Sequence, residues 1–377
     1  MFGIYLHIPF CKKACNYCDF HFSTSFKAKS EIIECLNKEL ESRKNELKGG
    51  VKTIYFGGGT PSVLCIDELN SIVNQIKQHY SLLKNIEITF ECNPEDLSIA
   101  SLKNLKEVGV NRLSIGVQSF DDIVLKWMNR AHNSEKALKG IRLAQELGFD
   151  NISIDLIYGI PEHLKRNWEL DIQKAIALNI QHISSYNLTK EKHTSLYNDV
   201  KKGEYSMPDQ DFCSQEYKVL TQNLTNAGFN QYEVSSFSLN GFESKHNSSY
   251  WSSVAYLGIG PSAHSYDGID TRRWNVSNNK SYVNAIMKDN KYFETEKLSN
   301  VDIANEIILL GLRSNIGVSL EKIKKLLTTA QLHVFNKQVT KLKDRALIVE
   351  TKKLLLVDVK SRILADYIAR ELFILPE

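Results

Sequence analysis

The 377-residue chain lacks the features of several specialised classes of protein. It has no apolar run long enough to cross a bilayer, and its first residues, MFGIYLHIPF, lack the basic segment that opens a secretory signal. The net charge of +3 is too small to indicate a nucleic acid or an acidic membrane as partner. The sequence also contains no internal repeat and no low-complexity segment. We therefore expect a cytoplasmic protein with an ordinary hydrophobic core.

Cysteine is scarce and unevenly placed. The chain has seven cysteines, an odd number, and three of them fall within the short stretch CKKACNYC, at Cys11, Cys15 and Cys18. Thiols stay reduced in the cytosol, so such a cluster indicates a metal site or a catalytic site, not a disulfide framework. The other cysteines are scattered, and we expect no metal role for Cys35, Cys65, Cys92 and Cys213.

Two metal centres agree with this thiol spacing. A structural zinc ion would need a fourth ligand, which His7 or His21 could supply. A [4Fe–4S] cluster held by the three cysteines would instead leave one iron without a protein ligand, open to a small molecule. The C-x3-C-x2-C spacing, on a loop directly after the first predicted strand, favours the cluster. Three unligated core cysteines are disfavoured because Lys12, Lys13 and Asn16, which lie between them, are polar.

The first half of the chain alternates short apolar runs with helical patterns. This order predicts a parallel sheet with crossover helices, either open or closed into a barrel. The expected strands cover residues 4–8, 52–57, 86–91, 111–117, 151–159 and 181–188, and the expected helices cover residues 29–47, 66–80, 98–109, 134–148 and 166–178. After residue 188 the alternation breaks down.

Polar residues and glycines follow the predicted strands where each one ends. Cys11 follows the first strand, residues 57–60 (GGGT) follow the second, Glu91 and Gln118 end the third and fourth, and Asp155 lies late in the fifth. Ligands of parallel α/β sheets bind at this carboxyl edge. The sequence therefore predicts a ligand site there.

These motifs together resemble a known family. C-x3-C-x2-C followed by GGGTP is similar to the radical S-adenosylmethionine (SAM) superfamily. The stretches YLHIPFCKKACNYCDF, YFGGGTPS, FECNPE, RLSIGVQSF, IDLIYGIP and GIGPSAHSY resemble the oxygen-independent coproporphyrinogen III oxidase (HemN) family and its heme chaperone branch, HemW, over nearly the whole chain. The resemblance implies an α/β fold, a partial (β/α)6 TIM-like radical SAM barrel with a C-terminal winged-helix-like α+β subdomain.

The implied domains are a radical SAM core over residues 1–235, a connecting segment over 236–298 that carries an H-N-x-x-Y-W motif, and a C-terminal winged-helix-like domain over 299–377. In the last of these, the pattern predicts helices over 301–313, 319–327 and 333–345, a hairpin over 346–358 and a final helix over 363–373. The resemblance implies that this domain covers the barrel mouth.

The resemblance also assigns roles to single residues. Cys11, Cys15 and Cys18 would hold the [4Fe–4S] cluster, whose open iron would chelate SAM. Arginine suits a carboxylate, and glycines allow a ligand to approach the backbone closely. The implied SAM site comprises Tyr5, Gly58, Gly59, Thr60, Glu91, Gln118, Arg130 and Asp155. Taken one at a time, such residues also have structural explanations, as a helix cap, a solvated cation or a satisfied buried acid.

Two departures from the HemN pattern favour the chaperone branch. The fourth cysteine of that family is replaced by Phe20, and only four residues precede Tyr5, so we expect the family's N-terminal extension to be missing. The stretch HNSSYW matches the H-N-x-x-Y-W motif, which implies His246 as a heme ligand; neutral imidazole is a common axial ligand of heme iron. His264 is the chief alternative ligand.

The leading hypothesis is a heme chaperone that binds heme, a [4Fe–4S] cluster and SAM, and delivers heme to acceptor proteins such as respiratory enzymes, membrane-associated ones included. It would also need an electron donor for the cluster. The alternative is a radical SAM oxidase of coproporphyrinogen III or a related tetrapyrrole, and a nucleic-acid regulator is disfavoured by the low net charge. Productive SAM cleavage, enzymatic activity and formation of a homodimer stay open.

Overall fold

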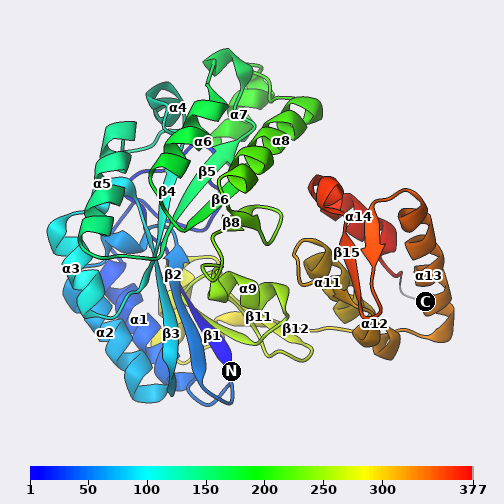
Figure 1. Ribbon diagram of the computed structural model, residues 1–377. Helices are drawn as coiled ribbons and strands as arrows, with labels where there is room; N and C mark the ends of the chain where they lie inside the picture. The colour runs from blue at the N-terminus through cyan, green and yellow to red at the C-terminus, as the bar shows by residue number, and fades with distance from the viewer. Residues whose placement is uncertain (376–377) are drawn as a thin grey trace.

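The computed structural model describes residues 1–375 and has a large mixed sheet at its centre (Figure 1). Twelve strands lie in the order β12-β11-β10-β9-β1-β2-β3-β4-β5-β6-β8-β7. The six predicted strands are adjacent and parallel in this sheet, so this prediction is confirmed. They are β1 (Phe2–Ile8), β2 (Val51–Gly58), β3 (Leu82–Cys92), β4 (Arg112–Gln118), β5 (Ile152–Tyr158) and β6 (His182–Asn187).

Crossover helices join these strands, because parallel neighbours need a long connection. Figure 1 shows α1, α2, α3 and α5 along the outside of the sheet. Side chains of Ser98, Asn133 and Asn167 cap three of these helices by accepting hydrogen bonds from backbone N–H groups of the first turn. The helices of this half are α1 (Lys29–Ser42), α2 (Ile66–His79), α3 (Ile99–Glu107), α4 (Asp122–Trp127), α5 (Ser134–Glu146) and α6 (Trp168–Ala177).

In the first half of the chain, two predicted boundaries differ from the structure by four residues or more. The helix expected over residues 29–47 ends at Ser42, and the side chain of the next residue, Arg43, bonds Glu39 (2.9 Å) and Glu46 (2.6 Å). The third strand was expected over residues 86–91 and begins earlier, at Leu82. Both discrepancies lie at element ends, away from the strand termini that form the site.

The segment after β6 extends the sheet at both edges. Helices α7 (Ser195–Lys202) and α8 (Gln210–Asn226) lead to β7 (Asn230–Gln231) and β8 (Ser236–Ser238), which pairs antiparallel with β6. At the other edge, β9 runs parallel to β1 and begins an antiparallel run. The remaining elements here are α9 (Lys245–Trp251), β9 (Tyr256–Ile259), β10 (His264–Tyr266), β11 (Thr271–Asn275), α10 (Asn279–Met287) and β12 (Phe293–Lys297).

The C-terminal residues form a smaller α+β unit, as predicted. It contains the three expected helices, the hairpin and the last helix, and one short strand that the sequence did not suggest, β13. The helix expected over residues 333–345 begins earlier, at Thr329, where the Thr328 side chain caps it. In Figure 1 the unit lies beside α9 and β11. Its elements are α11 (Asn300–Leu312), β13 (Val318–Ser319), α12 (Leu320–Leu326), α13 (Thr329–Asp344), β14 (Ile348–Glu350), β15 (Leu354–Val357) and α14 (Ala365–Leu372).

Each of these two parts has a main hydrophobic core, and a smaller cluster from Val124 to Leu196 lies in the first part. The main core runs from Phe2 to Ile286 and the second from Ala304 to Ile374. Residues 236–298 therefore belong to the main sheet and its core for most of their length. The exact domain boundaries stay predictions. Among residues 1–375, no helix combines the length and apolarity that a membrane span requires.

Candidate functional site

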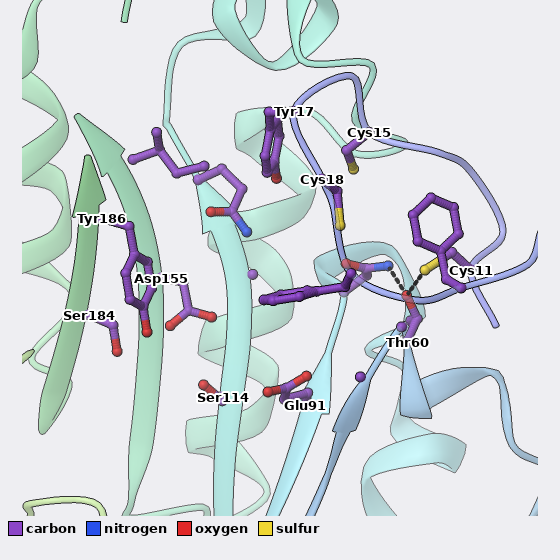
Figure 2. A pocket seen from close by; sticks show the side chains of 18 of the residues that line it. Cys11, Cys15, Tyr17, Cys18, Thr60, Glu91, Ser114, Asp155, Ser184 and Tyr186 are labelled. Carbon is purple, nitrogen blue, oxygen red and sulfur yellow. Dashed lines mark hydrogen bonds between the residues drawn. The ribbon is translucent and has the colours of Figure 1, made fainter. Parts of the chain in front are cut away.

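A cavity of about 360 Å³ lies at the carboxyl edge of the central strands. Ten of the twelve residues singled out by the sequence line it: Cys11, Cys15, Cys18, Gly58, Gly59, Thr60, Glu91, Gln118, Arg130 and Asp155. Figure 2 shows the three cysteines on one side of this cavity, with Asp155, Ser184 and Tyr186 across from them. The other two predicted residues, Tyr5 and His246, lie elsewhere. Parallel strands bring residues that are distant in sequence to one edge, which explains the convergence.

The three cysteines lie on the loop that follows β1, and all are half-buried free thiols. The loop is anchored at its start, where the backbone N–H of Cys11 donates to the Ser23 carbonyl (3.0 Å). It is anchored in the middle by Asn16, whose side-chain amide donates to the Trp127 carbonyl at the end of α4 (2.7 Å). These contacts hold the thiols toward the cavity.

A chain of polar side chains connects two of the thiols. The Thr60 hydroxyl donates to the Sγ of Cys11 (3.3 Å) and accepts from the Asn93 side-chain amide (3.2 Å). Asn93 in turn accepts from Arg130 (2.7 Å), whose other terminal nitrogen donates to the Sγ of Cys15 (3.3 Å). The sulfurs of Cys11 and Cys15 therefore receive side-chain hydrogen bonds, and donors to sulfur tune the potential of an iron–sulfur centre.

The donor set fits an iron–sulfur cluster. Burial raises the pKa of Cys11, and raises the pKa of Cys18 to about 12, so these groups stay thiols until a metal displaces their protons. Within residues 1–375, no three His, Cys, Asp or Glu side chains converge on a position for a single ion. A cluster needs no such common centre, because each cysteine binds its own iron.

The glycines after β2 have a packing reason of their own. A Cβ atom on Gly59 would lie 2.7 Å from the Phe10 carbonyl oxygen and 2.9 Å from that of Ile8. Gly58 has φ of +105°, and a side chain there would strike the His7 ring. The run therefore lets the end of β2 pass directly against the start of the cysteine loop.

Two carboxyl groups line the cavity away from the thiols. Burial raises the pKa of Glu91 to about 8 and that of Asp155 to about 6. Glu91 accepts a hydrogen bond from the Tyr55 hydroxyl (2.7 Å). Arg112 is 1% exposed and its charge opposes both shifts. Paired acids and a buried cation suit a ligand that carries amino, hydroxyl and carboxylate groups.

Gln118 ends β4 in an unusual backbone conformation. Its φ is +70°, and the pairing of β4 with β5 shifts register between Gly116 and Gln118. Non-glycine residues rarely adopt this conformation, and such positions cluster at functional sites. The irregularity places Gln118 on the cavity wall.

A second cavity of about 510 Å³ takes in Tyr5. It lies between β1, the cysteine loop, strands β9–β11 and helix α11. Tyr5 stacks on Tyr55, with ring centres 6.1 Å apart, so it lies next to the first cavity without lining it. Asp19 and Phe20 line both cavities. The C-terminal unit borders this second cavity and, within the described residues, not the first.

His246 lies inside the protein. Its side chain is 1% exposed, and both ring nitrogens are engaged, Nδ1 with the Thr53 hydroxyl and Nε2 with the Tyr250 hydroxyl, each at 2.8 Å. Burial lowers its pKa to about 3. The motif HNSSYW forms helix α9 between the cavities: Asn247 lines the first and Tyr250 the second.

Comparison with known proteins agrees with this geometry. The model of the radical SAM superfamily matches residues 5–175. The chain is 38% identical to the heme chaperone HemW of Bacillus subtilis (strain 168) over 325 residues, 85% of each protein. It is 35% identical to HemW of Lactococcus lactis subsp. lactis (strain IL1403) over 351 residues, 93% of this chain and 91% of that protein. The chain belongs to the HemW family of radical SAM proteins.

The solved structure of coproporphyrinogen III oxidase (HemN) from Escherichia coli shares the fold of this HemW-family chain. The TM-score is 0.85 at 22% identity, and the match covers 99% of this chain and 90% of the other. The predicted fold class, the partial barrel with its C-terminal unit, is thereby confirmed. Membership of the radical SAM superfamily implies a [4Fe–4S] cluster and SAM, and the three thiols beside a cavity with acids and a buried arginine fit both.

Sequence reasoning missed Asn93, Tyr55 and Arg112, which also line the first cavity. Asn93 could have been found, since it stands directly after β3 and within the quoted stretch FECNPE. Tyr55 lies inside an apolar strand, where nothing in the local pattern distinguishes a site residue from a core residue. Arg112 begins β4, and a charged residue in an otherwise apolar strand was a signal that the sequence reasoning passed over.

Proposed function

We propose that this chain is a heme chaperone: it holds heme and passes it to acceptor proteins. The observation that carries the proposal is the match to proteins named heme chaperone HemW, over 85% of the Bacillus subtilis protein and 91% of the Lactococcus lactis protein. The position of Phe20 supports it, since no fourth thiol follows Cys18 on the cysteine loop.

In this proposal the first cavity is the cofactor site. Cys11, Cys15 and Cys18 hold the [4Fe–4S] cluster, which when bound supplies an electron-transfer centre with one open iron. Arg130 fixes Cys15 and, through Asn93, the Thr60 hydroxyl. Because burial raises the pKa of Glu91 to about 8, this carboxyl is neutral near pH 7 and can donate or accept a hydrogen bond to SAM.

Several finer statements belong to the same proposal. The acceptors are heme-requiring proteins such as respiratory enzymes, some of them bound to membranes, and a reductant serves the cluster. The chain acts in the cytoplasm, in keeping with seven free cysteines. Whether it works as a homodimer is decided by measuring its mass in solution with and without heme.

The test is an anaerobic titration of the cluster-reconstituted protein with hemin, followed through the Soret absorbance. We expect saturable binding near one heme per chain, and then transfer of the bound heme to an apo-protein with a distinct heme spectrum. Without saturable binding the proposal fails. Turnover of coproporphyrinogen III by the same protein would then favour the alternative, a radical SAM oxidase.

A further inference from the structure

The second cavity is built mainly from aromatic side chains. Its walls include Tyr250 from α9, Tyr256 from β9, Tyr266 from β10 and Phe20 from the cysteine loop. Phe20 is 68% exposed and presents its ring to the cavity and to solvent. A cavity of about 510 Å³ with flat apolar walls suits a flat aromatic ligand.

Three histidines line this cavity, and they differ in what their rings already bond. His7 is buried, with one ring nitrogen on the His21 carbonyl (2.8 Å) and the other on the Tyr5 hydroxyl (3.2 Å). His21 bonds the Asn279 side chain through Nε2 (2.7 Å). Within the described residues the His264 ring makes no hydrogen bond; it is exposed and stacks on Trp274 at 6.2 Å between ring centres.

Arg272 brings a guanidinium to the same cavity, which Glu306 also lines. It lies on β11 opposite Tyr266, whereas His264 lies opposite Trp274 two residues away on β10. Directly opposed and alternate residues face one side of a sheet, so His264 and Arg272 are diagonal neighbours on one face. One guanidinium nitrogen pairs with Glu306 of α11 (2.7 Å), and Nε has no partner in the described residues. A guanidinium has five donors, which leaves several for a carboxylate ligand.

We propose that heme binds in the second cavity, with His264 as the axial ligand of its iron and Arg272 as the partner of a propionate. This inference rests on the proposed chaperone function and names the site of its cargo. His246 then acts as a positioning residue: it holds the Tyr250 hydroxyl (2.8 Å) and so fixes an aromatic wall of the cavity.

The test compares matched histidine variants of the full-length, cluster-reconstituted protein by hemin titration and by the ligand signature in electron paramagnetic resonance. In His264→Ala we expect hemin affinity to fall about tenfold or more and the imidazole signature to disappear, with added imidazole restoring it. His246→Gln, which can still bond both hydroxyl partners, should keep the wild-type signature. The control is His333→Ala, an exposed histidine on α13 outside both cavities.

A second comparison does not depend on the histidines. The wild type should bind hemin more tightly than hemin dimethyl ester, whose propionates carry no charge. Arg272→Gln should weaken hemin binding and abolish that preference.

The outcomes separate the inference from the function on which it rests. If the wild type does not bind hemin, the chaperone proposal itself fails. If the wild type binds hemin and folded His264→Ala keeps its affinity and signature, the chaperone stands and the site proposed here is wrong. Loss of the signature in folded His246→Gln would place the iron on His246 and overturn the inference as well. If His264→Ala does not fold, Arg272→Gln still tests the proposed site. An unchanged preference of Arg272→Gln for hemin over hemin dimethyl ester would refute the inference.

Discussion

Replacing Glu91 with glutamine should make the stability of the protein less dependent on pH. Burial raises the pKa of Glu91 from 4.5 to about 8. Between these values the folded protein retains a proton that the unfolded chain has lost, so the free energy of unfolding falls as the pH rises. Each pH unit in this window is worth about 1.36 kcal/mol. From pH 5.5 to 8 the Glu91 contribution therefore amounts to up to about 3 kcal/mol, and Glu91→Gln removes it.

The assay is urea unfolding of the cluster-free protein, followed by tryptophan fluorescence, at several pH values between 5.5 and 8.5. The wild type should lose stability over this range more steeply than Glu91→Gln. Glu107→Gln, at an exposed position of α3, is the control and should follow the wild type. If wild type and Glu91→Gln show the same slope, Glu91 is ionised in the folded protein and the account of the cavity as a site with a neutral carboxyl is refuted.

Three further changes test the cysteine loop and helix α9. Thr60→Val removes the hydroxyl that donates to the Sγ of Cys11 and should lower the reduction potential of the reconstituted cluster, whereas Thr60→Ser keeps the hydroxyl and should keep the potential. Equal potentials of Thr60→Val and the wild type in a redox titration would show that this hydrogen bond does not tune the cluster. Gly59→Ala forces a Cβ to within 2.7 Å of the Phe10 carbonyl oxygen, and it should lower the free energy of unfolding by about 1–3 kcal/mol and reduce iron loading. An unchanged free energy of unfolding and iron content would mean that the loop accommodates the methyl group without strain. His246→Ala leaves two buried hydroxyls without their partner and should lower the free energy of unfolding by about 2–4 kcal/mol in urea, unless α9 contributes little to the fold.

Much of the site could be predicted from the sequence because its parts follow strands. Cys11, Glu91 and Gln118 stand at or just beyond the ends of parallel strands, and the topology alone brings such ends together. His246 shows the limit of this reasoning. A histidine in a polar stretch can bind a ligand or form hydrogen bonds with buried hydroxyls. Only the contacts with Thr53 and Tyr250 in the folded protein show that His246 bonds buried hydroxyls.

The sequence by itself determined the parallel α/β core, the C-terminal α+β unit and the thiol motif, because alternating patterns and cysteine spacing are local properties of the chain. The tertiary structure alone decided that Tyr5 and His264 share a second cavity, that Asn93 and Arg130 connect the thiols of Cys11 and Cys15, and that His246 is enclosed. The physical reason is that burial, pKa and hydrogen-bond partners depend on neighbours brought together from distant parts of the chain, and no local pattern records them.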